Sequence, residues 1–394
     1  MPWEESSAMD QKVRFVARYR EGDVTMTALC EAFGISRECG YKWVARYESE
    51  GVDGLKARSR APLTHPNAAS AALVELVLDA RRQHPTWGPR KLLLWLAKKR
   101  PRTALPAASS VATWLKSHGL AGRARRPKMH SAPTATPALA SYQAANACWS
   151  TDFKGQFRTR DGTYCYPLTM QDVATRYLIR CQGLLSTAEA PARAIFASAF
   201  AEYGLPTFMR SDNGTPFSAT SFCGLSALSA WWVSLGIGID RIPPASPQHN
   251  GRIERMHRTL KAETTRPSAQ DLLGQQRKFN AFQREYNDER PHEGLDNATP
   301  SSLYTASPRR CPRIAPEPHY PERWSQRTVN PNGTTSFAGH YLQMGKMLAG
   351  YRLGFEPVDD GLWAVHFFGR RLGEFDELDA TLTCAGGVRE CTRH

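Results

Sequence analysis

Apolar side chains recur at helical spacing in two regions near the start of the chain. In residues 9–49 they fall into three segments, with a turn at Gly34 and with Ser36 as the N-cap of the third segment. Residues 66–119 repeat the pattern, and the sequence WGPR at 87–90 marks the turn into the middle segment. Both regions therefore predict three-helix modules of the helix-turn-helix type.

From about residue 146 the pattern changes to short apolar segments typical of strands. CWSTDFKGQF and TYCYPLTM predict a hairpin around Asp161-Gly162, and YLIRCQGL predicts a third strand. An amphipathic helix over 186–203, the short strands TFMR and IDRI, and helices over 271–287 follow. Strands that then alternate with helices predict an α/β core.

After about residue 324 the chain consists of short strand-like segments separated by turn residues. Asn332-Gly333 and Asp360-Gly361 are the clearest turns, and GYRLGFEPV and LWAVHFF the clearest strands. We expect a small β-barrel of about five strands, whose role could equally be DNA contact, dimerisation or purely structural.

The net charge of +14 predicts a polyanionic partner, and its distribution is uneven. Residues 1–60 carry ten Lys/Arg and ten Asp/Glu, whereas residues 80–151 carry thirteen Lys/Arg and no acid. A charged run can be merely solvated or disordered. We interpret an acid-free stretch this long as one that contacts phosphates.

Three carboxylates stand in stretches with a definite structural interpretation. Glu254 lies on a helix without Gly or Pro, beside an apolar stripe, and shares its face with Arg258 and Lys261. Asp212 follows the strand TFMR, at the kind of strand end where α/β sheets bind ligands. Asp152 lies within a strand, where Asp is rare and where a buried carboxylate needs a partner or a metal.

Each of these carboxylates also has an ordinary explanation. The helix could be a solvated helix with one salt-bridging pair, Asp212 a plain turn residue, and Asp152 a surface-facing strand residue. Asp172, a rival for the first position, lies in QDVATRY, which we interpret as a structural hairpin turn.

Taken together, the motifs resemble a known family. Asp152 preceded by Trp149, SDNG at 211–214 and PQHNGRIERMHRTLK at 247–261 closely resemble the catalytic core of the DDE transposase and retroviral-integrase superfamily, above all bacterial insertion-sequence transposases. Asp212 and Glu254 lie 42 residues apart, longer than is usual in such enzymes. We place the extra length in a slightly longer helix within residues 222–238.

The resemblance implies an RNase H-like fold and a metal-dependent reaction on DNA. Asp152, Asp212 and Glu254 would be both the catalytic residues and the ligands of two Mg²⁺ (or Mn²⁺) ions, with Asp152 bridging the two. Water would first free a 3′-OH at the element's end, and that 3′-OH would then attack target DNA. The partners would be element ends, target DNA and further copies of the chain on DNA, with no nucleotide cofactor and no P-loop.

Candidate DNA contacts come from both modules, from the basic segment that follows them and from the Glu254 helix. They are Arg37, Lys42, Arg46, Arg90, Lys91, Arg123, Arg125, Arg126, Lys128, Asn250, Arg258 and Lys261. The first module has no net charge, so it could instead dock protein. His292, in a segment that resembles the end of transposase cores, could support the site or be structural.

The sequence thus predicts a multidomain α/β protein. Its parts are a helix-turn-helix domain (1–60), a basic second one (66–125), a linker (126–143), an RNase H-like core (144–306) and a small β-barrel (320–385). Scattered cysteines without a CxxC pair favour reduced thiols and no zinc site. We see no signal peptide and no membrane-spanning run, and expect a cytoplasmic, nucleoid-associated bacterial protein.

Two further classes stay open. One is a DNA-binding regulator that keeps a transposase-like core without catalysis, which the intact trio of carboxylates disfavours. The other is a plain RNase H-like nuclease, which two helix-turn-helix modules disfavour, because bulk cleavage needs no sequence-specific readout.

Overall fold

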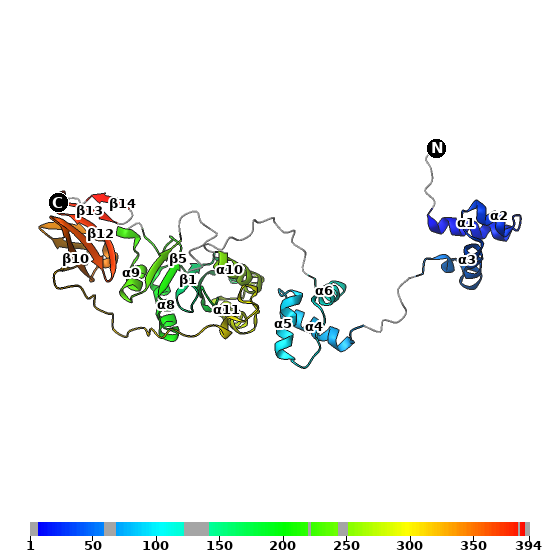
Figure 1. Cartoon of the computed structure of the whole chain (residues 1–394), viewed down its shortest axis with the longest axis horizontal. Coiled ribbons are helices and arrows are strands. Elements are labelled where there is room, and N and C mark those ends of the chain that lie inside the picture. The colour runs from blue at the N-terminus through cyan, green and yellow to red at the C-terminus, as the bar shows by residue number, and fades with distance from the viewer. Residues whose placement is uncertain are drawn as a thin grey trace. The chain divides into compact units, whose positions relative to one another are not determined.

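The computed structural model describes residues 7–58, 68–121, 142–219, 222–242, 251–384 and 387–390. The chain divides into two compact units, Met1–Ala69 and Ser70–His394 (Figure 1). Among the described residues, no helix combines the length and the apolar character needed to cross a membrane.

The first unit is a three-helix module. Its helices are α1 (Ala8–Glu21), α2 (Met26–Ala32) and α3 (Arg37–Glu50), followed by a 3₁₀ turn at Gly51–Leu55. Ser7, Thr25 and Ser36 each cap a helix by accepting a hydrogen bond from a backbone amide three residues on. Phe15, Leu29 and Leu55 form the buried centre, and the prediction of a helix-turn-helix module is confirmed.

The second unit opens with another three-helix module. It comprises α4 (Ala71–Gln83), α5 (Pro89–Lys99) and α6 (Ala108–Ser117), packed around Trp87 and Leu96. Pro89 begins α5 because the first helical position needs no backbone donor.

A mixed sheet forms the centre of the core. Its strands are β1 (Cys148–Phe153), β2 (Phe157–Arg158), β3 (Tyr164–Asp172), β4 (Leu178–Leu184), β5 (Phe208–Ser211) and β6 (Gly238–Arg241). Strand β3 pairs antiparallel with β1, β2 and β4, whereas β5 pairs parallel with both β1 and β6. The order β4-β3-β1-β5-β6 therefore brings the strand that carries Asp152 and the strand that precedes Asp212 side by side.

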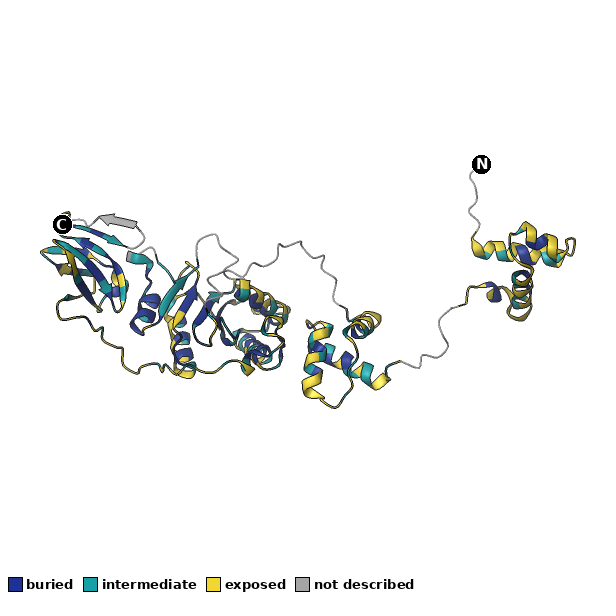
Figure 2. Cartoon of the chain, in the orientation of Figure 1, coloured by how far each residue is buried: buried dark blue, intermediate teal, exposed yellow. Residues whose placement is uncertain are grey.

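Helices cover both faces of this sheet. On one face α8 (Glu189–Tyr203) and α9 (Ala227–Ser234) bury Phe196, Phe200 and Trp232 against Trp149. On the other face α10 (Gly251–Thr264) and α11 (Leu272–Arg284) bury the stripes that include Met256 and Phe279. Figure 2 shows the buried positions concentrated along the strands and on one side of each helix.

The segment 222–238 differs from its prediction. It holds a 3₁₀ turn (Phe222–Gly224) and the eight-residue helix α9, not a longer helix. Leu225, Ala230 and Val233 belong to the core of the C-terminal domain, so the extra length makes contacts between domains.

The C-terminal domain is an open sheet. Strands β7 (Ser325–Thr328), β10 (Arg352–Asp359), β11 (Leu362–Phe367), β12 (Arg370–Asp376), β13 (Thr381–Cys384) and β14 (Gly387–Glu390) pair in the order β14-β13-β12-β11-β10-β7. A separate hairpin of β8 (Thr334–Phe337) and β9 (His340–Gln343) stacks Phe337 on Phe355, with ring centroids 4.0 Å apart. Within the described strands no pairing joins β7 to β14, so the predicted closed barrel is not confirmed.

Candidate catalytic site and nucleic-acid interface

Asp152 and Asp212 come from two neighbouring parallel strands. Strands β1 and β5 pair in register, with Ser150 opposite Arg210. Continuing that register by two residues brings Asp152 level with Asp212, which directly follows β5. Asp212 is exposed and turns back on itself, accepting a hydrogen bond from the Gly214 amide at 3.1 Å.

Helix α10 brings Glu254 and His257 to the same end of the sheet. His257 is buried, and its Nδ1 lies 3.7 Å from Oδ2 of Asp152. Its Nε2 lies 2.7 Å from the Thr169 hydroxyl, which also donates to the Asp152 carbonyl at 3.1 Å. Burial and the charge of Lys154 lower the pKa of His257 to about 3, so the ring is neutral and forms no ion pair with Asp152. Thr169 therefore fixes the backbone of Asp152 by a hydrogen bond, and His257 packs against its carboxylate.

The electrostatics of Asp152 couple the three carboxylates. Burial first, and then the negative charge of Asp212, raise the pKa of Asp152 to about 7, and Glu254 adds to the rise. The Phe153 amide and Lys154 act in the opposite direction. Near neutral pH, Asp152 is consequently poised between its two protonation states.

The donor set suits a hard divalent cation, because carboxylate oxygens are the ligands that Mg²⁺ prefers. Among the residues that the structure describes, no three His, Cys, Asp or Glu side chains converge closely enough to chelate a metal. Asp152, Asp212 and Glu254 are thus an electrostatic cluster whose chemistry fits a metal, and not a preformed chelating set.

Two other candidates are held by contacts within the fold. Asp172 is fully buried at the end of β3 and accepts hydrogen bonds from the Asn146 amide and from the amide and hydroxyl of Thr175. It fixes the β3–β4 turn, in agreement with its interpretation as structural. His292 is buried, with Nε2 3.2 Å from the Tyr286 carbonyl and its ring against the Tyr286 ring.

The first module presents its candidate DNA contacts on α3. Arg37 and Lys42 are exposed, and Arg46 is half-buried. Lys42 and Arg46 lie 5.5 and 5.1 Å from the centre of the Trp43 ring, so the indole orients both cations.

Other candidates lie in the second module and on α10. Arg90 is exposed and Lys91 half-buried in the first turn of α5, while Arg258 and Lys261 are exposed on the Glu254 side of α10. Five candidates lie outside the described residues, namely Arg123, Arg125, Arg126, Lys128 and Asn250.

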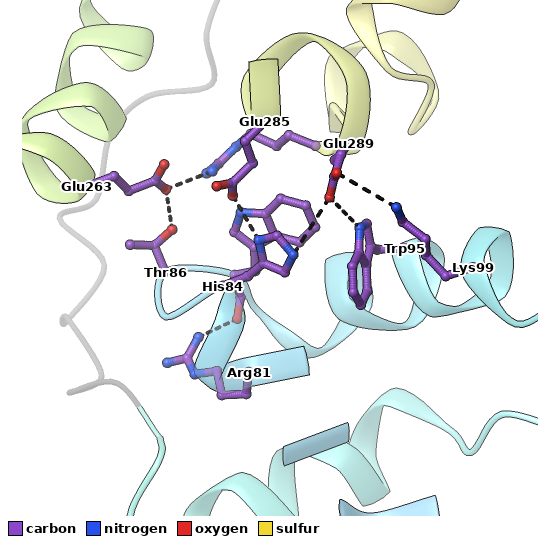
Figure 3. A network of polar contacts seen from close by, with 10 residues as sticks. Arg81, His84, Thr86, Trp95, Lys99, Glu263, Glu285 and Glu289 are labelled. Atoms are coloured by element: carbon purple, nitrogen blue, oxygen red, sulfur yellow. Dashed lines mark hydrogen bonds and ion pairs between the residues drawn. The ribbon is translucent and has the colours of Figure 1, made fainter. Parts of the chain in front are cut away.

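The second module also contacts the core directly, which the sequence did not predict. His84 Nδ1 lies 2.9 Å from Oε1 of Glu285, and Trp95 Nε1 donates to Oε2 of Glu289 at 2.8 Å (Figure 3). Thr86 hydrogen-bonds Glu263 on α10, and Lys99 lies 3.7 Å from Glu289. These partners are about 200 residues apart in the chain, so no local pattern indicates them.

Comparison with known proteins matches the same regions. A family profile described as an integrase core domain matches residues 235–300. A homeodomain-like profile matches residues 39–115, and a helix-turn-helix profile matches residues 11–62. These matches support the resemblance of the chain to transposases and integrases of the DDE superfamily.

Two viral polyproteins contain segments similar to part of this chain. The Gag-Pol polyprotein of baboon endogenous virus (strain M7) is 30% identical over 118 residues, which are 30% of this chain and 6% of that protein. The Pol polyprotein of feline endogenous virus ECE1 is 30% identical over 118 residues, which are 30% of this chain and 11% of that protein. The chain therefore spans only a small part of the length of these relatives.

Solved structures that are similar to this chain include two integrase structures. The HTLV-2 integrase catalytic core domain in complex with magnesium is 14% identical, with a TM-score of 0.33 over 41% of this chain and 98% of that one. A simian T-cell lymphotropic virus intasome in complex with the PP2A regulatory subunit B56 gamma is 15% identical, with a TM-score of 0.36. The match covers 75% of this chain and 97% of that one.

Proposed function

We propose that this protein is a DNA transposase of an insertion sequence. It binds the ends of its element, hydrolyses a phosphodiester bond there to free a 3′-OH, and joins that 3′-OH to target DNA by transesterification. In each step one P–O bond forms and one breaks at the attacked phosphorus, so no ATP is required.

The observation that carries this proposal is the electrostatic coupling of Asp152 to Asp212 and Glu254. The β1–β5 register and the position of Glu254 in the first turn of α10 account for that coupling. Functional sites are where burial and like charge shift a carboxyl pKa this far. Phosphoryl transfer needs oxygen ligands for metal and a positioned phosphate more than it needs covalent chemistry from the protein.

Asp152, Asp212 and Glu254 would hold Mg²⁺ or Mn²⁺, and we propose two ions per site. Bound there, the ions would activate the attacking oxygen and stabilise the leaving oxygen. Asp152 would release its proton on binding them. His257 would keep its carboxylate in position and Thr169 its backbone carbonyl, and Arg258 and Lys261 would hold the DNA backbone alongside. The HTLV-2 integrase catalytic core domain has itself been solved in complex with magnesium.

End recognition would belong to the helix-turn-helix modules. Arg37, Lys42 and Arg46 on α3 are the first candidates for base and phosphate contacts, because they are accessible and because Trp43 orders the latter two. We further propose that several copies assemble on the two ends, since both ends must be joined to one target, and that the protein acts in the bacterial nucleoid.

Each of the two competing functions leaves one feature of the chain without a purpose. A DNA-binding regulator has no need of three coupled acids, whose mutual repulsion costs stability. A plain nuclease has no need of two helix-turn-helix modules.

Incubation of the purified protein with its element's end sequence and Mg²⁺, followed by mapping of the nick at nucleotide resolution, tests the proposal. We expect a single nick that leaves a 3′-OH at the element's terminus, and joining of that strand to added plasmid. Nicks scattered over the substrate would indicate a nuclease, and intact DNA under binding conditions would indicate a regulator.

A further inference from the structure

A cavity of about 230 Å³ lies where the second module meets the core. Its walls come from the first turn of α5, the β3–β4 turn, α10 and the segment after α11. Five cations line it, together with one acid, Glu293; the cations are Lys91, Arg176, Arg252, Arg255 and Arg290.

This cavity is distinct from the carboxylate cluster. Arg252, Arg255 and Thr259 line it from α10, and their spacing of three and four residues puts them on one face of the helix. Glu254, Arg258 and Lys261 share a face about a third of a turn away. The cavity therefore lies on a different face of α10 from the carboxylate cluster.

The positive charge in the cavity is largely uncompensated. Arg290 Nη1 pairs with Glu263 at 2.8 Å, and Arg252 Nη1 donates to the Val173 carbonyl at 2.6 Å. Among the described residues, no carboxylate within ion-pair distance is found for Lys91, Arg176 or Arg255.

The remaining cations act on one another. Burial, followed by the charges of Arg290 and Arg255, lowers the pKa of Lys91 to about 8. Burial and Arg255 likewise lower the pKa of Arg176, whereas Glu293 only weakly opposes the shift at Lys91. Like charges gathered in a partly buried space cost free energy, which a bound anion would recover.

The cations are also held in place. A Cβ built on Gly294 would lie 2.1 Å from Nη2 of Arg176, so this glycine lets the guanidinium lie against the backbone. Lys91 stands in the first turn of α5, whose N-cap is Gly88 and has no side-chain cap, so the positive end of the helix dipole adds to the field there. Fixed cations with unshared donors are typical of phosphate-binding sites.

We propose that this cavity binds one phosphate group, and that the phosphate belongs to the backbone of the duplex DNA. The assignment rests on the proposed function. The DNA backbone is favoured over a free anion because Lys91 belongs to the acid-free stretch 80–151 of a chain with net charge +14. Since Lys91 comes from the module and the arginines from the core, one phosphate would link the two.

Two titrations of the full-length protein test this assignment, with the variants Lys91→Ala/Arg255→Ala, Gly294→Ala and the control Arg277→Ala. Arg277 is a cation on α11 outside the cavity. Calorimetry with inorganic phosphate in a low-salt chloride buffer measures the affinity of the cavity for phosphate in the absence of DNA. In the second titration the protein binds a random-sequence duplex of about 30 base pairs at a series of salt concentrations. The slope of log K against log salt gives the number of phosphates that the protein neutralises.

We expect wild type to bind phosphate, and the double variant to bind it at least about tenfold more weakly, since two charge-assisted contacts are lost. For the duplex, the slope of log K against log salt should become shallower by about 0.9 in the double variant. Gly294→Ala keeps every charge but displaces Arg176, so it should weaken phosphate binding several-fold. Arg277→Ala should change neither quantity.

Equal phosphate binding by wild type and the double variant would overturn the assignment of the cavity as a phosphate site. Phosphate binding lost in the double variant, with an unchanged duplex slope, would overturn the DNA backbone as its source. Neither titration involves cleavage, so failure of Mg²⁺-dependent nicking alongside the expected titrations would refute the proposed function and leave this site standing.

Discussion

The two helix-turn-helix modules share an architecture but balance their charge differently. In the first module two cations have acids of the same module as partners, since Arg58 pairs with Glu50 and Lys56 with Asp53. The second module has no acid after Asp79, yet His84, Trp95 and Lys99 find acids on the core. Of the cations in this acid-free stretch, Lys99 is therefore matched by a core acid only after the chain folds.

This difference shows that a segment's charge balance is a property of its neighbours in space. The first module is a compact unit of its own, and the second belongs to the same unit as the core. One cation of the second module, Lys91, lines the cavity that the module shares with the core. The second module would then couple DNA binding to the catalytic core, and the first would contribute recognition alone.

The sharpest test of this division of roles separates binding from chemistry. Asp152→Asn, Asp212→Asn and Glu254→Gln should each reduce end cleavage and strand transfer by at least ~10³-fold, because members of one catalytic unit are not additive. End binding, measured by gel shift, should survive, since both modules are intact. A variant with near-wild-type turnover would remove its residue from the site.

Removing residues 1–69 probes the modules themselves. The remaining unit should keep most of the salt dependence of DNA binding, and this truncation should reduce the slope less than deletion of residues 80–130 does, because the net positive charge lies there. Discrimination between end DNA and random DNA should fall. A slope that collapses on removal of the first module would contradict the comparison.

Trp95→Phe tests whether the second module is part of the core. The change leaves Glu289 without the indole donor at 2.8 Å, so the free energy of unfolding should drop by about 1–2 kcal/mol. In the first module, Tyr41→Phe removes an exposed hydroxyl and should stay within about 0.5 kcal/mol of wild type. Urea unfolding measures both, and equal effects would indicate an undocked second module.

An effect of similar size is expected as a difference in the pH dependence of stability between the two units. Asp152 holds its proton up to pH about 7 when folded but only to about pH 4 when unfolded, so stability of the second unit falls as pH rises through that window. Above pH 7 the free energy of unfolding of Asp152→Asn should therefore be about 1–2 kcal/mol higher than that of wild type. The difference should vanish below about pH 4.

In the first unit the change of stability with pH has the opposite sign. Hydrogen bonds from Ser7 lower the pKa of Asp10, and Lys56 lowers that of Asp53, so their contribution is lost as pH falls. Separate thermal transitions recorded from about pH 4 to 8 would distinguish the two units, and transitions that move together would contradict the assignment.

Much of the fold was predictable because it rests on local rules. Ser36 caps α3, Pro89 begins α5, and Asp161-Gly162 turns the β2–β3 hairpin, each through a preference of its own side chain or backbone. The closed barrel was not confirmed, and the longer helix over 222–238 was wrong, for the opposite reason. Strand closure depends on pairing between distant edges, and α9 and the residue Leu225 before it pack on the distant C-terminal domain.

The sequence by itself determined the three carboxylates as candidates, since their types, their order and their places at a strand, a strand end and a helix are local features. Only the tertiary structure decided that Asp152 lies level with Asp212, that a neutral His257 supports it, and that the core's glutamates meet His84 and Trp95. Strand register, burial and the electrostatic field at a side chain are sums over neighbours far apart in the chain. For the same reason the cavity around Lys91, whose arginines lie 85 to 199 residues further along, appears only once the chain is folded.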